Sequence, residues 1–276
     1  MNPLIRKLFY ALPVGLRYKA RRILYFPADL FRDRKSLVPP KGMIFTGRGD
    51  FIKGGTTMFA HFRNYTGITP KSRILDIGSG IGRMAVPFTK FLDKDGSYEG
   101  FDIVKQGVDW CTANITSRYP NFHFTLIPLK NDLYNLSTDK KASGLVFPYP
   151  DNDFDLVFLT SVFTHMLPDD VAHYIKEIKR VLKPGKSCFA TFFILDAESE
   201  SSMFKKGSKT FPHNYGNYSL MDKNVKEANV AYQKEYIFGL LEAGGFEISH
   251  HFRGYWSGMA PGKINEHQDV IIFKKA

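Results

Sequence analysis

Residues 73–83 read Arg73-Ile74-Leu75-Asp76-Ile77-Gly78-Ser79-Gly80-Ile81-Gly82-Arg83, and this stretch decides the fold. Its first five residues predict a short buried strand, and the apolar spacing over 83–92 predicts a helix that is kinked at Pro87. The glycines between them let the backbone turn tightly and approach a ligand with no Cβ in the way. The free N–H groups that begin a helix face the same turn. This order of elements is typical of a nucleotide site.

An acidic residue follows the glycine turn at the spacing that is typical of a nucleotide site. A second strand is predicted over 97–103, and Asp102 lies near its end, about 20 residues beyond the turn, where a carboxylate can accept from both hydroxyls of a ribose. The position where a dinucleotide site has its third glycine holds Arg83 instead. Two alternatives stay open, because Asp76 could simply cap the next turn and Asp102 could be an ordinary acid at a strand end.

Strands and helices alternate outward from this turn. The patterns predict strands over 73–77, 97–103, 121–127, 154–160, 187–195, 246–252 and 269–273, and helices over 83–92, 105–118, 168–182 and 227–243. We therefore expect an α/β fold with a doubly wound, mostly parallel, seven-stranded sheet of the Rossmann-like kind. Residues 196–226 are polar and too long for an ordinary connection, which predicts a lid loop.

At these residues the sequence resembles the class I S-adenosylmethionine-dependent methyltransferases, in the branch whose domain is called type 11. The resemblance covers about residues 68–195. It rests on Leu75-Asp76-Ile77-Gly78-Ser79-Gly80, Asp102, Phe147-Pro148-Tyr149, Phe154-Asp155-Leu156-Val157, Ser161-Val162-Phe163-Thr164-His165 and Arg180-Val181-Leu182-Lys183-Pro184-Gly185. It implies a methyltransferase fold whose last strand is antiparallel.

The resemblance also implies S-adenosyl-L-methionine as the cofactor. Asp76 and the glycine turn would hold its methionine end, Asp102 its ribose, and the tip of the fourth strand would lie beside the methyl group. The family usually has an acidic or amide side chain just after strand three, but Ile127-Pro128-Leu129 stands there, so the backbone of Leu129 or the side chain of Asp132 would bind adenine. The implied cofactor residues are Asp76, Gly78, Ser79, Gly80, Gly82, Asp102, Ile103, Leu129, Asp132, Thr160 and Ser161.

Histidines and aromatic residues are the candidates for the acceptor side. His165 is the candidate catalytic base, which a hydroxyl acceptor needs and an unprotonated amine does not. His213, Tyr215 and Trp256 are candidate substrate residues, with apolar faces and polar tips. Each of these residues has packing or capping as its alternative. No metal is expected, because neither cysteine has ligands at metal spacing.

The N-terminal segment 1–41 is a basic arm. It holds ten Lys and Arg against two Asp, a surplus of eight within a net charge of +11 for all 276 residues. Apolar residues lie between these charges, which predicts an amphipathic helical arm ahead of a methyltransferase domain over 42–276. Two alternatives stay open: residues 1–36 contact an anionic membrane, or the arm packs its apolar side on the domain.

We therefore predict a bacterial, cytoplasmic methyltransferase, peripheral to the inner membrane face if the arm binds lipid. Its acceptor is predicted to be a small molecule, a lipid or a glycan. Nucleic acid is disfavoured because the strand-four tip lacks a proline-proline-aromatic run on which a flipped base could stack. The rival functions are a non-catalytic module that binds S-adenosylmethionine or S-adenosylhomocysteine and, less favoured, an NAD(P)-dependent oxidoreductase, which would need the missing glycine.

Overall fold

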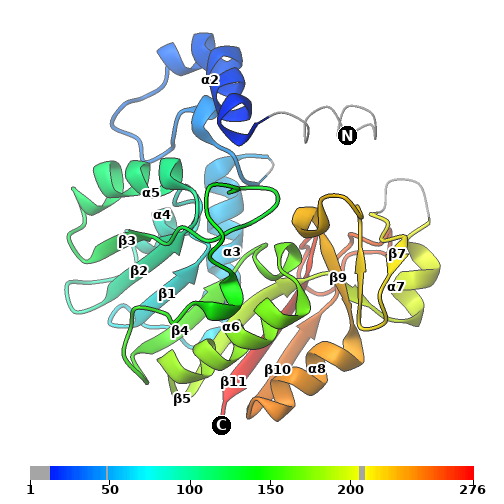
Figure 1. Cartoon of the computed structure of the whole chain (residues 1–276). Coiled ribbons are helices and arrows are strands. Elements are labelled where there is room, and N and C mark those ends of the chain that lie inside the picture. The colour runs from blue at the N-terminus through cyan, green and yellow to red at the C-terminus, as the bar shows by residue number, and fades with distance from the viewer. Residues whose placement is uncertain (1–12, 48, 205–208) are drawn as a thin grey trace.

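Seven strands form one mixed sheet with helices on both faces (Figure 1). The structure, a computed structural model, describes residues 13–47, 49–204 and 209–276. The strand order is β10-β11-β5-β4-β1-β2-β3, and β11 runs antiparallel to both of its neighbours. The strands are β1 (Arg73–Ile77), β2 (Ser97–Asp102), β3 (Phe122–Leu126), β4 (Phe154–Leu159), β5 (Leu182–Phe192), β10 (Phe246–Phe252) and β11 (Asp269–Lys275). The predicted fold class is confirmed.

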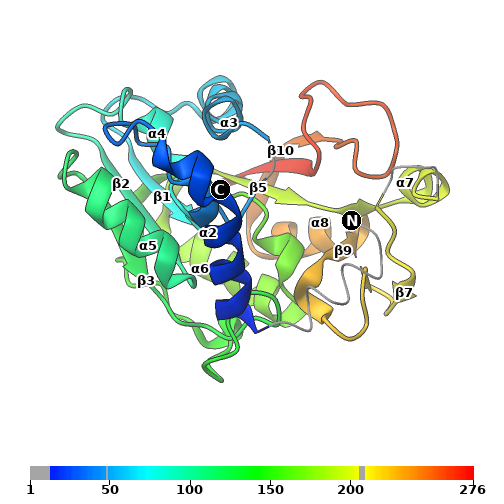
Figure 2. The same cartoon turned by 90° about the horizontal axis from the view of Figure 1, so that it is seen from above.

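The two faces of the sheet pack against different helices, because alternate residues of a strand point to opposite sides. Leu75 and Ile77 of β1 pack with α6 (Pro168–Val181) and α8 (Lys234–Ala243). Ile74 lies in the other core, with α3 (Phe51–Thr66), α4 (Ala85–Phe88) and α5 (Lys105–Cys111). Figure 2, seen from above, separates α3 from α6 and α8 across the sheet. β1 is therefore buried on both faces, as expected for a central parallel strand.

Three predicted helices differ from the structure. In place of the longer, kinked helix predicted over 83–92, the structure has only the single turn α4, which contains Pro87. The helix predicted over 105–118 is α5 followed by a π-helical stretch, Thr112–Thr116. The helix predicted over 168–182 ends at Val181, because the strand predicted over 187–195 already starts at Leu182, with a register shift against β4.

A second, smaller sheet follows β5. Its order is β6-β9-β8-β7, made by β6 (Ile194–Leu195), β9 (Val230–Gln233), β8 (Tyr218–Leu220) and β7 (His213–Asn214). The segment 196–226 thus contributes α7 (Ala197–Ser202), β7, β8 and the start of the 3₁₀ turn η5 (Lys226–Ala228) to a folded unit. The helix predicted over 227–243 starts only at Lys234, because Val230 to Gln233 pair with β8 and β6 instead.

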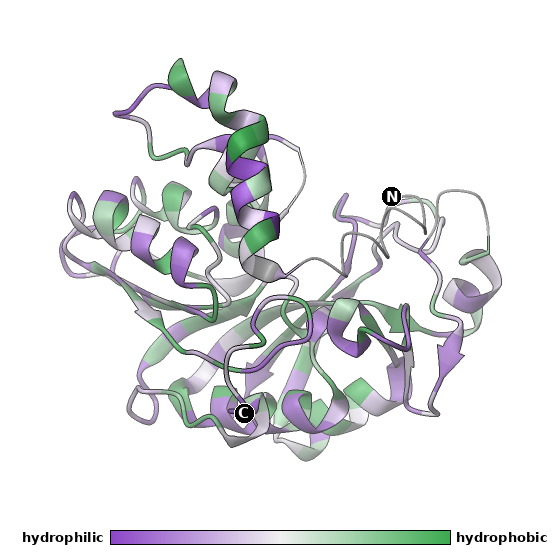
Figure 3. Cartoon of the chain, turned by 45° about the horizontal axis from the view of Figure 1, so that its top comes forward, coloured by the Kyte–Doolittle hydropathy of each residue, from purple (hydrophilic) through white to green (hydrophobic). Residues whose placement is uncertain are grey.

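The arm contains α2 (Val14–Leu30), followed by the 3₁₀ turn η1 (Lys41–Met43). Residues 1–12 of the predicted arm lie outside the described residues. Figures 1 and 2 show α2 above the sheet beside α5, and Figure 3 shows hydrophobic and hydrophilic residues mixed along it. No helix in the described ranges is long and apolar enough to cross a bilayer.

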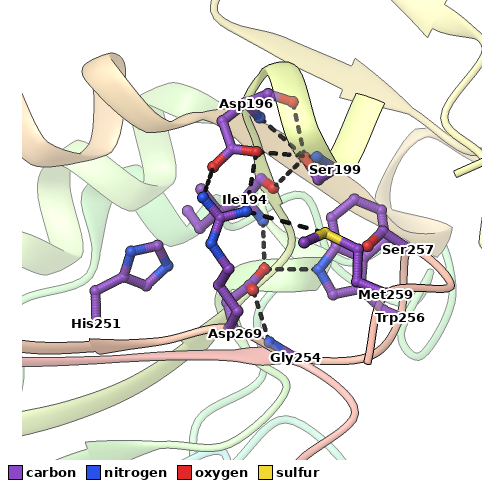
Figure 4. Close-up of a pocket in the computed structure, with 10 residues that line it drawn as sticks. Ile194, Asp196, Ser199, His251, Gly254, Trp256, Ser257, Met259 and Asp269 are labelled. Carbon is purple, nitrogen blue, oxygen red and sulfur yellow. Dashed lines mark hydrogen bonds and ion pairs between the residues drawn. The ribbon is translucent and has the colours of Figure 1, made fainter. Parts of the chain in front are cut away.

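The Asp269 carboxylate joins the two sheets (Figure 4). One oxygen accepts from the Ile194 backbone N–H and the Trp256 indole N–H, both at 2.7 Å, and the other accepts from the Gly254 N–H at 2.8 Å. The cavity beside it has a volume of about 10 Å³. That volume is room for one water molecule and not for a substrate.

Removing this carboxylate should destabilise the fold. Asp269→Ala leaves three buried donors without an acceptor, so we expect the free energy of unfolding to fall by about 2–4 kcal/mol. Urea denaturation followed by circular dichroism measures the loss. Asp139→Ala is the control, because the Asp139 side chain is fully exposed, and it should change stability by less than about 0.5 kcal/mol. Equal losses in the two variants would contradict this role.

Candidate functional site

The glycine turn follows β1 and is tied to the end of β2. Gly78, Gly80 and Gly82 have φ values of 77°, 57° and 81°, in the left-handed region that glycine adopts without strain. The backbone N–H groups of Gly78 and Ser79 both donate to the carbonyl of Phe101, at 2.9 and 3.0 Å. The turn therefore has a fixed position at the carboxyl end of the sheet. It lies next to the switch point between β1 and β4, where the strand order reverses.

Asp102 is buried at the end of β2 and faces the turn. One carboxylate oxygen accepts from the Gly80 N–H and the other from the Val104 N–H, both at 2.7 Å. Burial raises the pKa of Asp102 to about 6, against the lowering effect of these backbone donors. Each oxygen keeps a further lone pair, so the carboxylate can still accept from a ligand.

Asp76 is buried at the base of the same turn. Its Oδ2 accepts from the Tyr98 hydroxyl at 2.5 Å. Its Oδ1 and the hydroxyl of Ser79 are buried and have no hydrogen-bond partner among the described residues. Burial raises the pKa of Asp76 to about 8, the Tyr98 hydroxyl lowers it, and the charge of Asp102 raises it further. Two orphaned oxygens in one buried turn point to a ligand that would pair with them.

The tip of β4 adjoins the glycine turn. Thr160 and Ser161 directly follow the strand, and Ser161 has a φ of 62°, which is uncommon for a residue other than glycine. The Ser161 N–H donates to the Thr191 hydroxyl at 2.7 Å, and the Ser161 hydroxyl donates to Gln268 Oε1 at 2.9 Å. The structure therefore holds this tip from β5 and from the segment before β11.

His165 ends the 3₁₀ turn η4 (Phe163–His165), beyond the tip of β4. Its Nδ1 lies 2.9 Å from the Glu227 carbonyl oxygen, so Nδ1 carries the proton and Nε2 keeps a lone pair. Burial lowers the pKa of His165 to about 4, only partly offset by the Glu227 carbonyl. The imidazole is therefore neutral near pH 7.

The segment after β3 lies against η5. Leu129 is buried, and its carbonyl accepts from the Asn135 side chain at 2.9 Å. The Asp132 N–H donates to Glu227 Oε2 at 2.7 Å, while the Asp132 side chain and Ile103 are half-buried. Glu227 thus contacts both His165 and the segment after β3. Burial raises the pKa of Glu227 to about 7.

The three predicted substrate residues do not lie at the glycine turn. His213 is in β7, the outer strand of the small sheet, on the opposite side of the molecule from β1 and β2 in both views (Figures 1 and 2). Tyr215 is exposed and stacks on Tyr218. Trp256 is 1% exposed and packs in a small apolar cluster with Phe193 and Phe211. The structure gives Trp256 a core position, which was the alternative weighed for it.

Val162 lies in a motif of the resemblance but had no predicted role, and three further residues at the site had no clear sequence signal: Gly107, Gln268 and Glu227. Val162 packs on the turn, since a Cβ on Gly78 would lie 2.4 Å from Val162 Cγ2. A Cβ on Gly107 would lie 2.0 Å from the Gly80 carbonyl oxygen, so α5 can pack on the turn only with glycine there. A glycine near the start of a predicted helix was its one hint. Gln268 and Glu227 reach the site from distant segments. Within the described ranges no three metal-ligating side chains lie together.

Comparisons with known proteins agree with this geometry. Residues 75–190 match the family model of the type 11 methyltransferase domain. This segment is a class I S-adenosylmethionine-dependent methyltransferase domain. The seven-stranded sheet with its antiparallel last strand, β11, is the one that the resemblance in the sequence implied.

Similar chains come from distant organisms. An uncharacterized methyltransferase of Schizosaccharomyces pombe is 33% identical over 113 residues, which cover 41% of this chain and 37% of that protein. The ubiquinone/menaquinone biosynthesis C-methyltransferase UbiE of Vibrio cholerae is 22% identical over 209 residues, or 68% of each chain. The solved structure of the PH0226 protein from Pyrococcus horikoshii has a TM-score of 0.58 at 16% identity and covers 83% of this chain and 93% of that one. That last likeness concerns the fold alone.

The methyltransferase domain has the groups that S-adenosylmethionine requires, which is the methyl donor of this family. Its methionine end carries an ammonium group, which needs an acceptor, and a carboxylate, which needs donors. The orphaned Asp76 Oδ1 is an acceptor, and the orphaned Ser79 hydroxyl can donate. Asp102 keeps lone pairs for hydroxyl groups. The buried polar atoms of the turn therefore fit the cofactor.

Cofactor affinity should depend on pH through Asp76. In the free protein this carboxyl is protonated below about pH 8, and it must lose that proton to accept from an ammonium group. We therefore expect the affinity for S-adenosylhomocysteine to rise by up to about tenfold per pH unit below pH 8 and to level off above it. Isothermal titration calorimetry from about pH 6.5 to about pH 9 measures this, because that range lies above the Asp102 transition near pH 6 and includes the Asp76 transition near pH 8.

Asp76→Asn is the matched variant for that titration. The amide has nearly the same shape and keeps an oxygen for the Tyr98 hydroxyl, but it has no proton to lose. It should bind more weakly at pH 8 and show no slope over the same range. A flat profile in the unaltered protein would remove Asp76 from the binding equilibrium.

Proposed function

We propose that this protein transfers the methyl group of S-adenosylmethionine to a small-molecule, lipid or glycan acceptor. The observation that carries the proposal is the buried turn with the orphaned Asp76 Oδ1 and Ser79 hydroxyl, facing the Asp102 carboxylate, inside a type 11 methyltransferase domain. Methyl transfer from a sulfonium asks the protein mainly to align donor and acceptor in a dry site. A buried turn at the carboxyl end of the sheet supports that task.

Each proposed role follows from position. Asp76, Gly78, Ser79, Gly80 and Gly82 bind the methionine end of the cofactor. Asp102 and Ile103 bind the ribose, Leu129 and Asp132 lie at the adenine, and Thr160 and Ser161 lie beside the methyl group. His165 is the proposed base for a hydroxyl acceptor, because its neutral imidazole keeps a lone pair on Nε2. Its low pKa makes it a weak base, so it suits an acceptor whose proton leaves late in the transfer.

The acceptor class rests on more than the family. Acceptors in the names of related chains include quinones, a sterol and a tRNA, so membership of the family does not select one. A small or lipid acceptor is supported by the exposed apolar side chains of α2, such as Ile23 and Leu24. Nucleic acid is disfavoured because no aromatic platform stands at the tip of β4, where Thr160-Ser161-Val162 follows the strand.

The proposal is tested by methyl labelling. Purified protein and S-adenosylmethionine with an isotope-labelled methyl group are incubated with a cell extract, and mass spectrometry identifies the molecules that gain the label. We expect labelled small molecules or lipids and a loss of labelling in Asp102→Ala, which removes the acceptor of two backbone donors. Cofactor binding without labelling in any extract would favour the non-catalytic module, and labelled RNA would overturn the acceptor class.

The outer face of α2 supports membrane contact. Five large apolar side chains of the arm are more than half exposed: Ile23, Leu24, Phe26, Leu30 and Phe31. Basic residues of the arm surround them, with Arg34 and Lys35 exposed just beyond the helix. An apolar helix face among basic residues matches the surface of an anionic bilayer. We propose that this face binds the protein peripherally to the cytoplasmic side of a bacterial inner membrane, close to lipid acceptors.

Vesicle binding tests this second part of the proposal. The protein should sediment with phosphatidylglycerol vesicles at low salt and much less at high salt, because counter-ions screen the basic residues. Leu24→Asp should reduce sedimentation at least about tenfold, since it places a charge within the apolar face. Val146→Asp is the control, because Val146 is similarly exposed at 68%, against 72% for Leu24, but lies outside α2. No sedimentation of the unaltered protein would exclude membrane contact.

A further inference from the structure

The segment between residues 17 and 46 contacts the candidate cofactor site at three places. Thr46 lies over the glycine turn, since a Cβ on Gly80 would be 3.1 Å from Thr46 Oγ1. Phe45 lies over the start of α5, because a Cβ on Gly107 would be 3.1 Å from the Phe45 ring. Arg17 lies against the segment after β3 and donates to the Leu133 carbonyl at 3.1 Å. These are the regions proposed to hold the methionine end, the ribose and the adenine.

Tyr18 connects two of these contacts, because it follows Arg17 in α2 and packs on Phe45. Its ring packs on Phe45 with the centroids 5.7 Å apart, and the ring is half-buried. Burial raises the pKa of Tyr18 to about 12, the Asp102 carboxylate raises it further, and Arg17 lowers it. Because Phe45 packs on Tyr18 and also lies over Gly107 at the start of α5, the Tyr18 ring is placed on the side of the site where Asp102 ends β2. No hydrogen bond to this hydroxyl exists among the described residues.

Polar contacts hold α2 in this position. The Arg22 guanidinium donates to Gln106 Oε1 at 2.9 Å, and the Gln106 amide donates to the Met43 carbonyl at 2.9 Å. The Asp29 carboxylate accepts from the backbone N–H groups of Lys41 and Gly42, at 2.6 and 2.9 Å. Hydrogen bonds thus connect the helix to both η1 and the first turn of α5, which begins three residues after Asp102.

The two faces of α2 do different things. Tyr18, Arg22 and Asp29 follow one stripe of the helix, because spacings of four and seven residues return to the same side. Exposed Ile23 and Leu30 lie about 100° further round the helix axis than Arg22 and Asp29, and exposed Leu24 lies about 200° round from Arg22. The helix can therefore stay on the domain while its outer face contacts lipid. The two alternatives for the arm, packing and membrane contact, are compatible.

We propose that α2 is the outer wall of the cofactor site and that the Tyr18 hydroxyl binds the ribose of the cofactor, opposite Asp102. This inference rests on the proposed function. A phenol can both donate to and accept from a ribose hydroxyl, while Asp102 can only accept. The Tyr18 ring also keeps water from the pair, which strengthens the hydrogen bonds made inside. α2 is thereby part of the nucleoside site and not an appendage that precedes it.

Calorimetry with S-adenosylhomocysteine at pH 8 tests this wall. Tyr18→Phe, which keeps the ring and loses the hydroxyl, should weaken binding about 3- to 10-fold, the effect of one hydrogen bond. Tyr18→Ala, which also opens the wall, should weaken it further and speed dissociation in stopped-flow experiments. Tyr25→Phe is the matched control: it removes a hydroxyl from the same helix two turns away, where Tyr25 packs on Arg21, and should bind as the unaltered protein does.

The outcomes separate this inference from the proposed function. If the unaltered protein fails to bind S-adenosylhomocysteine, the proposed function itself fails. If it binds and Tyr18→Phe binds equally well, the hydroxyl contact is overturned while the proposed function stands. If Tyr18→Ala also binds and dissociates at the normal rate, α2 is not a wall of the site. Thermal unfolding of each variant checks that the domain remains folded, and Tyr18→Phe keeps the test valid if Tyr18→Ala does not fold.

Discussion

The hydrogen bond from the Gly80 N–H to the Asp102 carboxylate connects two strand ends on which the whole site depends. β1 and β2 are parallel neighbours in a register that pairs Asp76 with Gly100, so both acids lie near the same edge of the sheet. The turn then has to pass over the end of β2 with the Gly78 and Ser79 N–H groups directed at the Phe101 carbonyl and the Gly80 N–H directed at that carboxylate. Only a backbone with glycines at the left-handed positions can do so. The orphaned oxygens, the close packing of Val162 and the approach of α5 all follow from this placement.

Burying two carboxylates so close together has a cost in stability. Burial raises the pKa of both Asp76 and Asp102 above the value of an exposed aspartate. A group whose pKa is raised by folding binds its proton more tightly in the folded state, so the free protein loses stability as the pH rises towards these values. A ligand with an ammonium group and hydroxyls offsets that loss when it binds the folded state. The turn is thus less stable than a packed apolar turn, and this is expected of a binding site.

The arm connects this buried site to the surface. Arg17 of the arm, together with Phe45 and Thr46 just after it, contacts the parts of the site that β1, β2 and β3 position, and the outer face of α2 remains apolar. The proposed function, methyl transfer to an acceptor in a membrane, needs a site that excludes water and a surface that contacts lipid. One helix with two faces meets both needs, since its inner stripe is polar and aromatic while its outer stripe is apolar and lies among basic charges.

The sequence by itself determined the central sheet, the glycine turn and its acidic partner. β1 and β10 have the predicted bounds, because β1 is a mostly apolar run that ends in glycine, while β10 alternates apolar Phe246, Ile248 and Phe252 with polar residues. It could not determine that Val230 to Gln233 form a strand, because only pairing with β8 and β6 overrides their helical spacing. The positions of Gln268, Glu227 and Tyr18 near the site were likewise decided by the tertiary structure alone. Their contacts join residues far apart in the chain, and no local pattern records which distant segments will pack together.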